Sequence, residues 1–451
     1  MKNWRLLFVL PFVIPFLSSG QILYETGQLF PNDIGPGDRF GYSVSVSGKW
    51  GIVGAFRDDD AGMNSGSAYV FDMYNQQQLL KLTAADGTEL DLFGCSVAAN
   101  GNLGVVGAET GGSNGAETGF VCVFDLSSGA QVTKLVADDG EPYDQFGDSV
   151  ALSDSYVAVG AVGDDTGSFL GAGSVYVYDT SLWSEVRKIV PDDVTSDFLF
   201  GHSVAIAGSM LLAGAPGDDV YGLNSGSAYL FDMDTGLQVM KFIPADGFQN
   251  DGFGLSVALS EEFVVIAAVE HDAAGADAGA VYVYDIFTGQ ELHKLTASDA
   301  SSGDRFGSSI AVSGNLIVVG SIRDDDVGSS SGSAYIFDAT TGDQLYKLIA
   351  SDGSAGAWFG NAVGIDGGNI VVGAYDNAAR DGGGAAYVYV VPTNPATCIA
   401  DTNNDGVLSP ADFSAWVAAF NSQAPECDQN GDGSCTPADF SAWVANYNAG
   451  C

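Results

Sequence analysis

The stretch Phe146-Gly-Asp-Ser-Val-Ala-Leu152 decides the fold, because its side chains alternate as they do along a β-strand. Three more short runs of this kind complete the unit: Tyr156-Val-Ala-Val-Gly-Ala161, Ser174-Val-Tyr-Val-Tyr178 and Val186-Arg-Lys-Ile-Val190. Clusters of Gly, Asp and Ser, which are typical of turns, separate most of the runs. Four short strands joined by turns indicate one blade of a β-propeller.

The Phe-Gly pair that opens this stretch recurs along the chain at Phe40, Phe93, Phe146, Phe200, Phe253, Phe306 and Phe359, at intervals of 53, 53, 54, 53, 53 and 53 residues. A period this regular indicates stacked supersecondary units. The two-residue alternation and the 61 Gly exclude a helical solenoid. We therefore predict an all-β, seven-bladed propeller of four-stranded blades over residues 21–391.

The two ends of the repeat array predict how the ring closes. The seventh copy stops after its third strand, at residues 386–391, and lacks a fourth strand there. Residues 24–33, before the first Phe-Gly pair, match the fourth-strand segment 341–348 of the sixth copy. We expect the N-terminal strand, near Gln28-Leu29-Phe30, to complete blade seven and leave no open sheet edge.

The repeated elements Phe-Gly-x-Ser-Val, Val-Gly-Ala and Gly-Ser-Ala-Tyr-Val-Phe resemble the FG-GAP repeat of integrin α-chain propellers and their bacterial relatives. Gly214-Ala215-Pro216 reproduces the tripeptide of that name, whereas blade five has Ala267-Ala268. The resemblance implies the fold for about residues 24–391 and suggests calcium sites between the Phe-Gly and Gly-Ala-Pro elements. Here that interval, for example 204–210, is too short for a calcium loop.

One face of the propeller is predicted to carry long acidic loops, which join strand two to strand three and one blade to the next. Binding sites commonly lie on such exposed loops over a rigid scaffold. The candidate binding residues are Asp58, Asp59, Asp60, Asp164, Asp165, Asp218, Asp219, Asp324, Asp325 and Asp326. The alternative is a structural role, since Asp also satisfies turn backbones. We expect that role at Asp38, Asp91, Asp144, Asp251 and Asp304, each two residues before its Phe.

The N-terminus and the charge of the chain bear on its location and partners. Residues 1–20 read as a signal peptide, with a basic start, an apolar run too short to span a bilayer and small residues before Gln21. No later stretch is long and apolar enough for a transmembrane segment. Lys+Arg is 15 and Asp+Glu is 57, so the net charge of −42 excludes nucleic acid as a partner. We expect a secreted or cell-surface protein.

After a linker at residues 392–397, two near-identical segments 27 residues apart predict a calcium-binding domain over residues 398–451. Each has oxygen donors at loop positions 1, 3, 5 and 12 and Gly at position 6, as a calcium loop requires. Positions 7 and 9 supply a backbone carbonyl and a hydroxyl. The predicted ligands of two calcium ions are Asp401, Asn403, Asp405, Val407, Ser409 and Asp412, and Asp428, Asn430, Asp432, Ser434, Thr436 and Asp439.

A helix is predicted after each calcium loop, making the domain α-helical and EF-hand-like. Phe413, Trp416, Val417 and Phe420 form one apolar stripe, and Phe440, Trp443, Val444 and Tyr447 form the other. We expect the stripes to pack against each other; a partner-binding stripe is the alternative. The paired units resemble a type I dockerin, which implies a cohesin-like or cell-envelope partner. Loop positions 10 and 11 are Pro-Ala rather than polar, which leaves an attachment or sorting tail as the alternative.

Four of the six cysteines lie in the last 54 residues, and export permits disulfides. Cys398, Cys427, Cys435 and Cys451 allow three pairings. Because a pseudo-symmetric pair of units brings its ends together, we favour Cys398 with Cys451 and Cys427 with Cys435. Cys95 and Cys122 lie two strands apart, too far for a bridge, and we expect them to be free and buried.

No catalytic constellation is recognisable in the sequence. Of the three histidines, His202 follows a Phe-Gly pair, His293 lies in a fourth strand and His271 lies in a blade-five loop, where we expect it to be solvated. The leading hypothesis is a non-catalytic binding or adhesion protein, with a propeller face for a protein or glycan and a calcium-loaded module for docking. The alternative is a polysaccharide-active lyase or hydrolase. Two facing carboxylates in a cleft with an unshared His or Arg would favour the enzyme.

Overall fold

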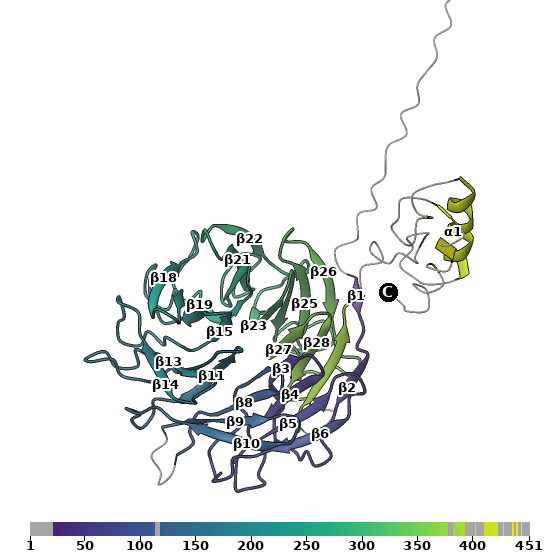
Figure 1. Ribbon diagram of the computed structural model, residues 1–451. Coiled ribbons are helices and arrows are strands. Elements are labelled where there is room, and N and C mark those ends of the chain that lie inside the picture. The colour runs from purple at the N-terminus through teal and green to yellow at the C-terminus, as the bar shows by residue number, and fades with distance from the viewer. Residues whose placement is uncertain are drawn as a thin grey trace, which may run out of the picture.

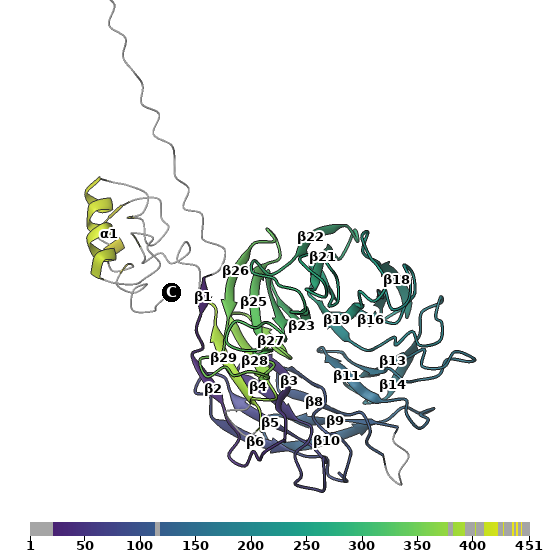
Figure 2. The same ribbon diagram turned by 180° about the vertical axis from the view of Figure 1, so that it is seen from behind.

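The computed structural model describes residues 21–112, 118–377, 382–392, 402, 410–422, 427, 435–436, 439–440 and 443. Seven sheets are arranged around a central axis, so the prediction of a seven-bladed propeller is confirmed (Figures 1 and 2). In the blade used as the specimen above, the strands are Phe146–Leu152, Tyr156–Ala161, Ser174–Asp179 and Glu185–Ile189. They match the expected runs to within one residue at each end.

The strands of each blade pair in chain order from the axis outwards. Blade one contains β3 (Phe40–Ser47), β4 (Trp50–Ala55), β5 (Ser67–Asp72) and β6 (Gln78–Leu82). Blade two contains β7 (Val97–Asn100), β8 (Leu103–Ala108), β9 (Phe120–Asp125) and β10 (Ala130–Leu135). Blade three contains β11 (Phe146–Leu152), β12 (Tyr156–Ala161), β13 (Ser174–Asp179) and β14 (Glu185–Ile189). Blade four contains β15 (Val204–Ala207), β16 (Met210–Ala215), β17 (Ser227–Asp232) and β18 (Leu237–Phe242).

The other three blades follow the same order. Blade five contains β19 (Phe253–Leu259), β20 (Phe263–Ala268), β21 (Ala280–Asp285) and β22 (Glu291–Leu295). Blade six contains β23 (Phe306–Ser313), β24 (Leu316–Ser321), β25 (Ser333–Asp338) and β26 (Gln344–Leu348). Blade seven contains β27 (Val363–Asp366), β28 (Asn369–Ala374), β29 (Ala385–Val390) and the N-terminal β2 (Gly27–Leu29). Each innermost strand contacts the innermost strand of the next blade, and β27 contacts β3, so the ring is closed.

The N-terminal segment closes the ring as the sequence predicts. Strand β2 pairs antiparallel with β29, with Gln28 opposite Tyr387 and Leu29 opposite Ala386. One addition was not predicted: β1 (Ile22–Leu23) pairs in parallel with β26, so that blade six has five strands. The backbone N–H of Lys347 in β26 donates to the carbonyl of Gln21. Strand β1 thereby covers part of an edge that would otherwise be open.

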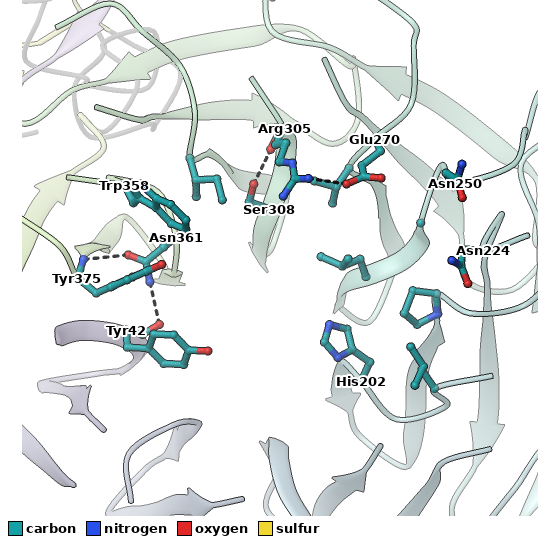
Figure 3. A pocket seen from close by; sticks show the side chains of 16 residues that line it. Tyr42, His202, Asn224, Asn250, Glu270, Arg305, Ser308, Trp358, Asn361 and Tyr375 are labelled. Atoms are coloured by element: carbon teal, nitrogen blue, oxygen red, sulfur yellow. Dashed lines mark hydrogen bonds and ion pairs between the residues drawn. The ribbon is translucent and has the colours of Figure 1, made fainter. Parts of the chain in front are cut away.

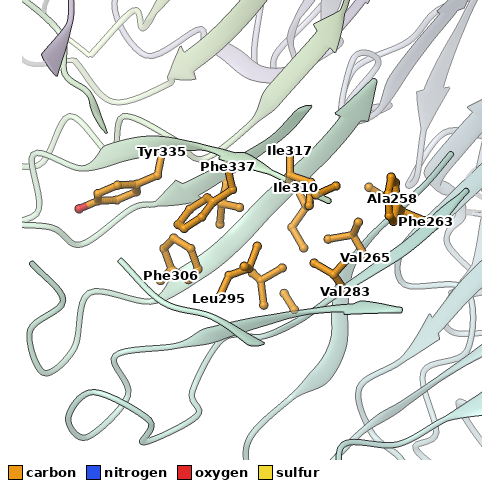
Figure 4. Close-up of a cluster of buried hydrophobic side chains, with 14 of the residues drawn as sticks. Ala258, Phe263, Val265, Val283, Leu295, Phe306, Ile310, Ile317, Tyr335 and Phe337 are labelled. Atoms are coloured by element: carbon orange, nitrogen blue, oxygen red, sulfur yellow. The ribbon is translucent and has the colours of Figure 1, made fainter. Parts of the chain in front are cut away.

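Buried side chains between neighbouring sheets hold the blades together. In the cluster between blades five and six, Phe306 is fully buried, and its ring centroid lies 5.7 Å from those of Tyr335 and Phe337 (Figure 4). Val265 and Val283 of blade five complete the contact from the other side. The Phe of the repeated pair is thus a core residue, which explains why it recurs in every blade.

The Gly of the repeated pair is required by a close approach between blades. Gly94 has a φ of 96°, and a Cβ there would lie 2.4 Å from the carbonyl oxygen of Ser67 in the preceding blade. The Ser of Phe-Gly-x-Ser adds a bond between blades, as Ser43 Oγ donates to the carbonyl of Gly94 at 2.8 Å. Between blades seven and one, Asn361 Nδ2 donates instead to the carbonyl of Gly41 at 3.0 Å.

In the C-terminal region the structure describes one helix, α1 (Pro410–Ser422). Aromatic rings of the two predicted stripes meet, with Phe413 5.8 Å from Phe440 and 5.3 Å from Trp443. This confirms the packing of the stripes against each other among the residues described. Within the described part of the chain, no helix has the length and apolar character needed to cross a membrane.

Candidate functional site

A lysine of the fourth strand gathers the acidic loops around itself. In blade one, Lys81 Nζ lies 2.9 Å from Asp58 Oδ2 and 2.8 Å from Asp33 Oδ2, and Tyr69 donates its hydroxyl to Asp58 at 2.7 Å. Asp58 is 2% exposed, so this ion pair is largely removed from water. Burial alone would lower the pKa of Lys81, but its bonds to Asp33, Asp60 and Asp58 raise that pKa above the ordinary value. We call this arrangement the lysine cluster.

The lysine cluster recurs in blades three, four and six. The Nζ-to-carboxylate distances are 2.7 Å for Lys188–Asp164, 2.8 Å for Lys241–Asp218 and 3.0 Å for Lys347–Asp324. Asp299, Asp324 and Asp326 converge closely enough to hold a metal ion. The ammonium of Lys347 bonds to all three of these carboxylates and supplies the positive charge there.

Each of the ten acidic residues predicted for the binding face has a partner within its own blade. Asp58, Asp164, Asp218 and Asp324 are buried and bind the lysine, which Asp60 and Asp326 also reach. Asp59, Asp165, Asp219 and Asp325 are exposed and accept backbone N–H groups of their own loops. These contacts give the acidic loops a structural role. Ligand binding by the exposed members stays a prediction.

Each Asp that lies two positions before a repeated Phe caps a turn, as expected. Asp38 accepts the backbone N–H of Gly35 at 2.5 Å, Asp144 that of Glu141 at 2.6 Å and Asp304 that of Ser301 at 2.6 Å. Asp91 and Asp251 do the same for the residue three positions before them.

His271 is not the solvated residue that the sequence suggested. It is 8% exposed and occupies the place of the buried Asp in the lysine cluster of blade five, where its Nε2 lies 3.2 Å from Lys294 Nζ. The expectation failed because the residue was judged by its loop, whereas its position in the repeat equals that of Asp58. Since Lys294 can only donate, Nε2 is the acceptor in this contact. Nδ1 is buried without a hydrogen-bond partner.

Blades two and seven vary the lysine cluster, and among the residues that the structure describes there no buried charge is left unpaired at these positions. In blade two, Gly111 replaces the Asp and Cys122 replaces the Tyr, and Lys134 lies 3.6 Å above the Phe120 ring while binding Asp86. In blade seven, Asn377 donates to the hydroxyl of Tyr387 at 2.8 Å. Gln28 stands opposite Tyr387 where Lys347 stands opposite Tyr335. Both charged partners are thus replaced by amides.

The same face has a cavity of about 640 Å³ at the axis of the ring, which we call the central pocket (Figure 3). Three positions of the repeat supply most of its lining, in blade one and in blades four to seven: the residue before Phe-Gly, the residue after Phe-Gly and the residue after Gly-Ala. All lining residues except Asn224, Asn250 and Glu270 occupy one of these positions. The first position holds Arg39, Leu92, Gln145, Leu199, Gly252, Arg305 and Trp358; the second holds Tyr42, Cys95, Asp148, His202, Leu255, Ser308 and Asn361; the third holds Phe56, Glu109, Val162, Pro216, Val269, Ile322 and Tyr375.

These three positions vary strongly from copy to copy, and sequence reasoning missed them because it searched for what the copies share. Aligning the seven copies and marking the columns that differ would have found them. The first position also has an unusual backbone, since its six non-glycine residues have φ between 56° and 64°. That left-handed conformation costs roughly 1 kcal/mol for a residue with a side chain. Strain of this kind is often found where side chains are placed for function.

One wall of the central pocket is aromatic. The Tyr42 ring centroid lies 4.2 Å from that of Phe56 and 5.4 Å from that of Tyr375, and Trp358 lies 5.5 Å from Tyr375. Asn361 fixes the wall, because its amide donates to the carbonyl of Tyr42 and accepts the backbone N–H of Tyr375. In Figure 3, His202, Asn224 and Asn250 lie on the opposite side of the pocket.

Two carboxyl groups lie beside His202, so that blades two, three and four each contribute one titratable residue. His202 Nδ1 is 3.5 Å from Asp148 Oδ2, and Asp148 lies near Glu109. Burial, together with the nearby Asp148, raises the pKa of Glu109 to about 7. Burial alone would lower the pKa of His202, but Asp148 raises it above the ordinary value.

The predicted calcium ligands fall mostly outside the described residues. This applies to Asp401, Asn403, Asp405, Val407, Ser409, Asp428, Asn430, Asp432 and Ser434, while Asp412 lies in α1 with no side-chain description. Thr436 and Asp439 are described: the backbone N–H of Thr436 donates to Asp439 Oδ2 at 2.7 Å, as at a capped helix start. The calcium site therefore stays a prediction.

The cysteine predictions are confirmed where the structure describes them. Cys427 and Cys435 form a disulfide, with Cα atoms 5.5 Å apart. Cys95 and Cys122 are free and buried. Cys398 and Cys451 lie outside the described residues.

Comparison with known families finds the FG-GAP repeat seven times, at residues 24–71, 76–124, 130–178, 183–231, 237–284, 290–337 and 343–389. Each match begins near the fourth strand of one blade and ends in the third strand of the next. The sequence unit is thus offset from the structural blade, which is why the N-terminal strand belongs to blade seven. No curated protein matches the chain.

Proposed function

Because the chain belongs to the FG-GAP repeat family, we propose that it is a secreted binding or adhesion protein without catalytic activity. Its propeller recognises a protein or glycan, and its C-terminal module, loaded with two calcium ions, docks or attaches it to a cohesin-like or cell-envelope partner. The fold alone supports many activities, so the proposal depends on the site.

The observation that carries the proposal is the contrast between the repeated and the varied positions of one face. The acidic loops of blades one, three, four and six bind their own lysines, as scaffold residues do. The varied positions of blades one and four to seven line a cavity whose volume is typical of ligand sites. A repeated scaffold with varied side chains around a cavity is the arrangement expected for a recognition site.

One observation favours the alternative, a polysaccharide-active enzyme: Glu109, Asp148 and His202 lie together beside the pocket. Hydrolysis of a glycosidic bond requires two carboxyl groups about 5 Å or more apart, with the sugar between them. Glu109 and Asp148 instead lie close enough for Asp148 to raise the pKa of Glu109, and neither residue lines the central pocket. We therefore favour binding.

The proposal is tested by capture of partners from the secreted and envelope fractions of the same organism, using the mature full-length chain as bait. We expect wild-type chain to retain a component that Tyr42→Ala and Trp358→Ala chains lose. Chelator should release a second component that the pocket variants retain. Turnover of a polysaccharide by the purified chain, abolished by Glu109→Gln, would contradict the proposal and support the enzyme.

A further inference from the structure

The aromatic wall of the central pocket offers flat apolar surface at an open site. Tyr42 is 37% exposed, although its ring is packed against Phe56 and Tyr375. Trp358 and Tyr375 continue the surface, and the ribbon close-up places these rings along one side of the cavity (Figure 3). Exposed rings that are held in place by neighbours can bury the apolar face of a ligand with little further loss of side-chain freedom.

The described residues that line the pocket leave no charge unpaired with which to hold an ionic ligand. Among them Arg305 is the only Arg or Lys and Glu270 the only carboxylate, and Arg305 Nη2 lies 2.6 Å from Glu270 Oε1. His202 faces Asp148. An anion would have to displace Glu270 against the repulsion of a chain with net charge −42, and a cation would have to displace Arg305. The pocket therefore fits a neutral ligand.

Two amides opposite the aromatic wall can make the polar contacts. Asn224 and Asn250 are exposed, and their side chains form no hydrogen bond within the described part of the chain. Their backbones are nevertheless fixed, because the N–H of Asn224 donates to Asp219 and that of Asn250 donates to the carbonyl of Leu223. An amide offers two donors and an acceptor, which suits adjacent hydroxyl groups.

A pyranose sugar meets these requirements, because it is neutral, has an apolar face and carries several hydroxyl groups. We propose that the central pocket binds the neutral sugar residues of a glycan, with the ring stacked on Tyr42 and Trp358 and its hydroxyls bonded to Asn224 and Asn250. This inference rests on the proposed function and names its ligand.

The test is calorimetric titration of the mature full-length chain with short neutral gluco-, manno-, galacto- and xylo-oligosaccharides, and with oligogalacturonates of the same lengths. We expect at least one neutral series to bind and the uronates to bind more weakly. Tyr42→Ala and Trp358→Ala should each lower that affinity about tenfold or more, as for other central aromatic contacts. Asn224→Gly and Asn250→Gly should lower it about three- to tenfold, while glycine keeps the left-handed backbone.

Two controls keep the result interpretable. Tyr74→Ala removes a ring that is 78% exposed in the turn between β5 and β6, and it should leave the affinity unchanged. Trp358→Phe keeps an aromatic ring and should retain most of the binding if Trp358→Ala fails to fold. Absence of neutral-sugar binding, stronger binding of uronates, or binding insensitive to all pocket variants would overturn the inference. Pocket-dependent capture of a protein, with no sugar binding, would overturn the sugar assignment and leave the proposed function intact.

Discussion

At the scale of single residues, the lysine cluster shows how a strongly acidic chain buries carboxylates. A buried ion pair gives little net stability compared with apolar packing, but removing one partner leaves the other charge uncompensated. Lys347 is 4% exposed and Asp324 is 3% exposed, and two further carboxylates bind the same ammonium. Burial alone would raise the pKa of Asp324, but Tyr335 and Lys347 lower it below the ordinary value.

We predict that Lys347→Met destabilises the propeller by about 3–5 kcal/mol, the usual cost of breaking a buried pair. Lys134→Met is the matched control, since its blade has no buried Asp at this position and Asp86 is exposed; about 1 kcal/mol or less is expected there. Urea unfolding at neutral pH measures the loss of stability in both variants. Equal losses in the two variants would show that the buried Asp324 does not set the cost.

His271→Asp should stabilise the chain by about 1 kcal/mol at neutral pH. The substitution gives blade five the lysine cluster of blades three and four, in which the lysine binds two carboxylates, and it removes the buried Nδ1 that has no partner. The difference in thermal unfolding midpoint between the wild-type and variant chains measures this effect. A lower midpoint for the variant would mean that the histidine is itself the better partner for Lys294.

The pair Glu109–Asp148 predicts a dependence of stability on pH. The pKa of Glu109 is about 7 in the folded state and lies near 4.5 in the unfolded chain, so the folded state binds the proton more tightly. Its contribution to stability is fully present below pH 4.5 and is lost as the pH rises through 7. Glu109→Gln should therefore stabilise the chain relative to wild type at pH 8 but not at pH 5, by on the order of 1–3 kcal/mol. Unfolding curves at the two pH values give the difference, and an equal effect at both would refute the raised pKa of Glu109.

At the scale of elements, two glycines allow the cost of backbone strain to be measured separately from the cost of a steric clash between blades. Gly94 and Gly101 both have positive φ, but a Cβ at Gly94 would meet the Ser67 carbonyl, whereas a Cβ at Gly101 meets nothing within 4 Å. Gly101→Ala thus measures the cost of backbone strain alone. Gly94→Ala measures that cost together with the cost of a clash between two neighbouring blades.

We predict a loss of about 1 kcal/mol for Gly101→Ala and of about 3 kcal/mol or more for Gly94→Ala. Chemical denaturation of the two variants provides the comparison. Similar losses would mean that neighbouring blades can separate slightly without cost.

Much of the element scale could be predicted from the sequence, because alternation, period and turn residues act locally. The strands of blade three and the joining of residues 27–29 to blade seven were found in this way. Strand β1 could not be predicted, since only two residues pair and their partner lies in another blade. The burial of His271 and the aromatic wall depend on which side chains the ring brings together. No single repeat contains that information.

At the scale of the whole molecule, the predicted calcium loops should act independently of the propeller. Calorimetric titration of the full-length chain should show two calcium ions bound, and Asp405→Ala with Asp432→Ala should abolish both events because each removes a carboxylate ligand. Chelation should leave the unfolding transition of the propeller unchanged. Retained binding in the double variant would place the calcium elsewhere, with the cluster around Lys347 as the next site to examine.

The pairing of β2 with β29 also imposes an order on folding. The hydroxyl of Thr26 donates to the carbonyl of Val388, a contact that spans 362 residues of chain. As a chain is synthesised from its N-terminus, residues 27–29 must wait without a partner until the last blade has been made. Contacts of such long range form slowly, since the entropy of closing the loop has to be overcome first. We therefore expect closure of blade seven to be the last and slowest step, and an incompletely synthesised chain to expose the unpaired residues 27–29 to aggregation.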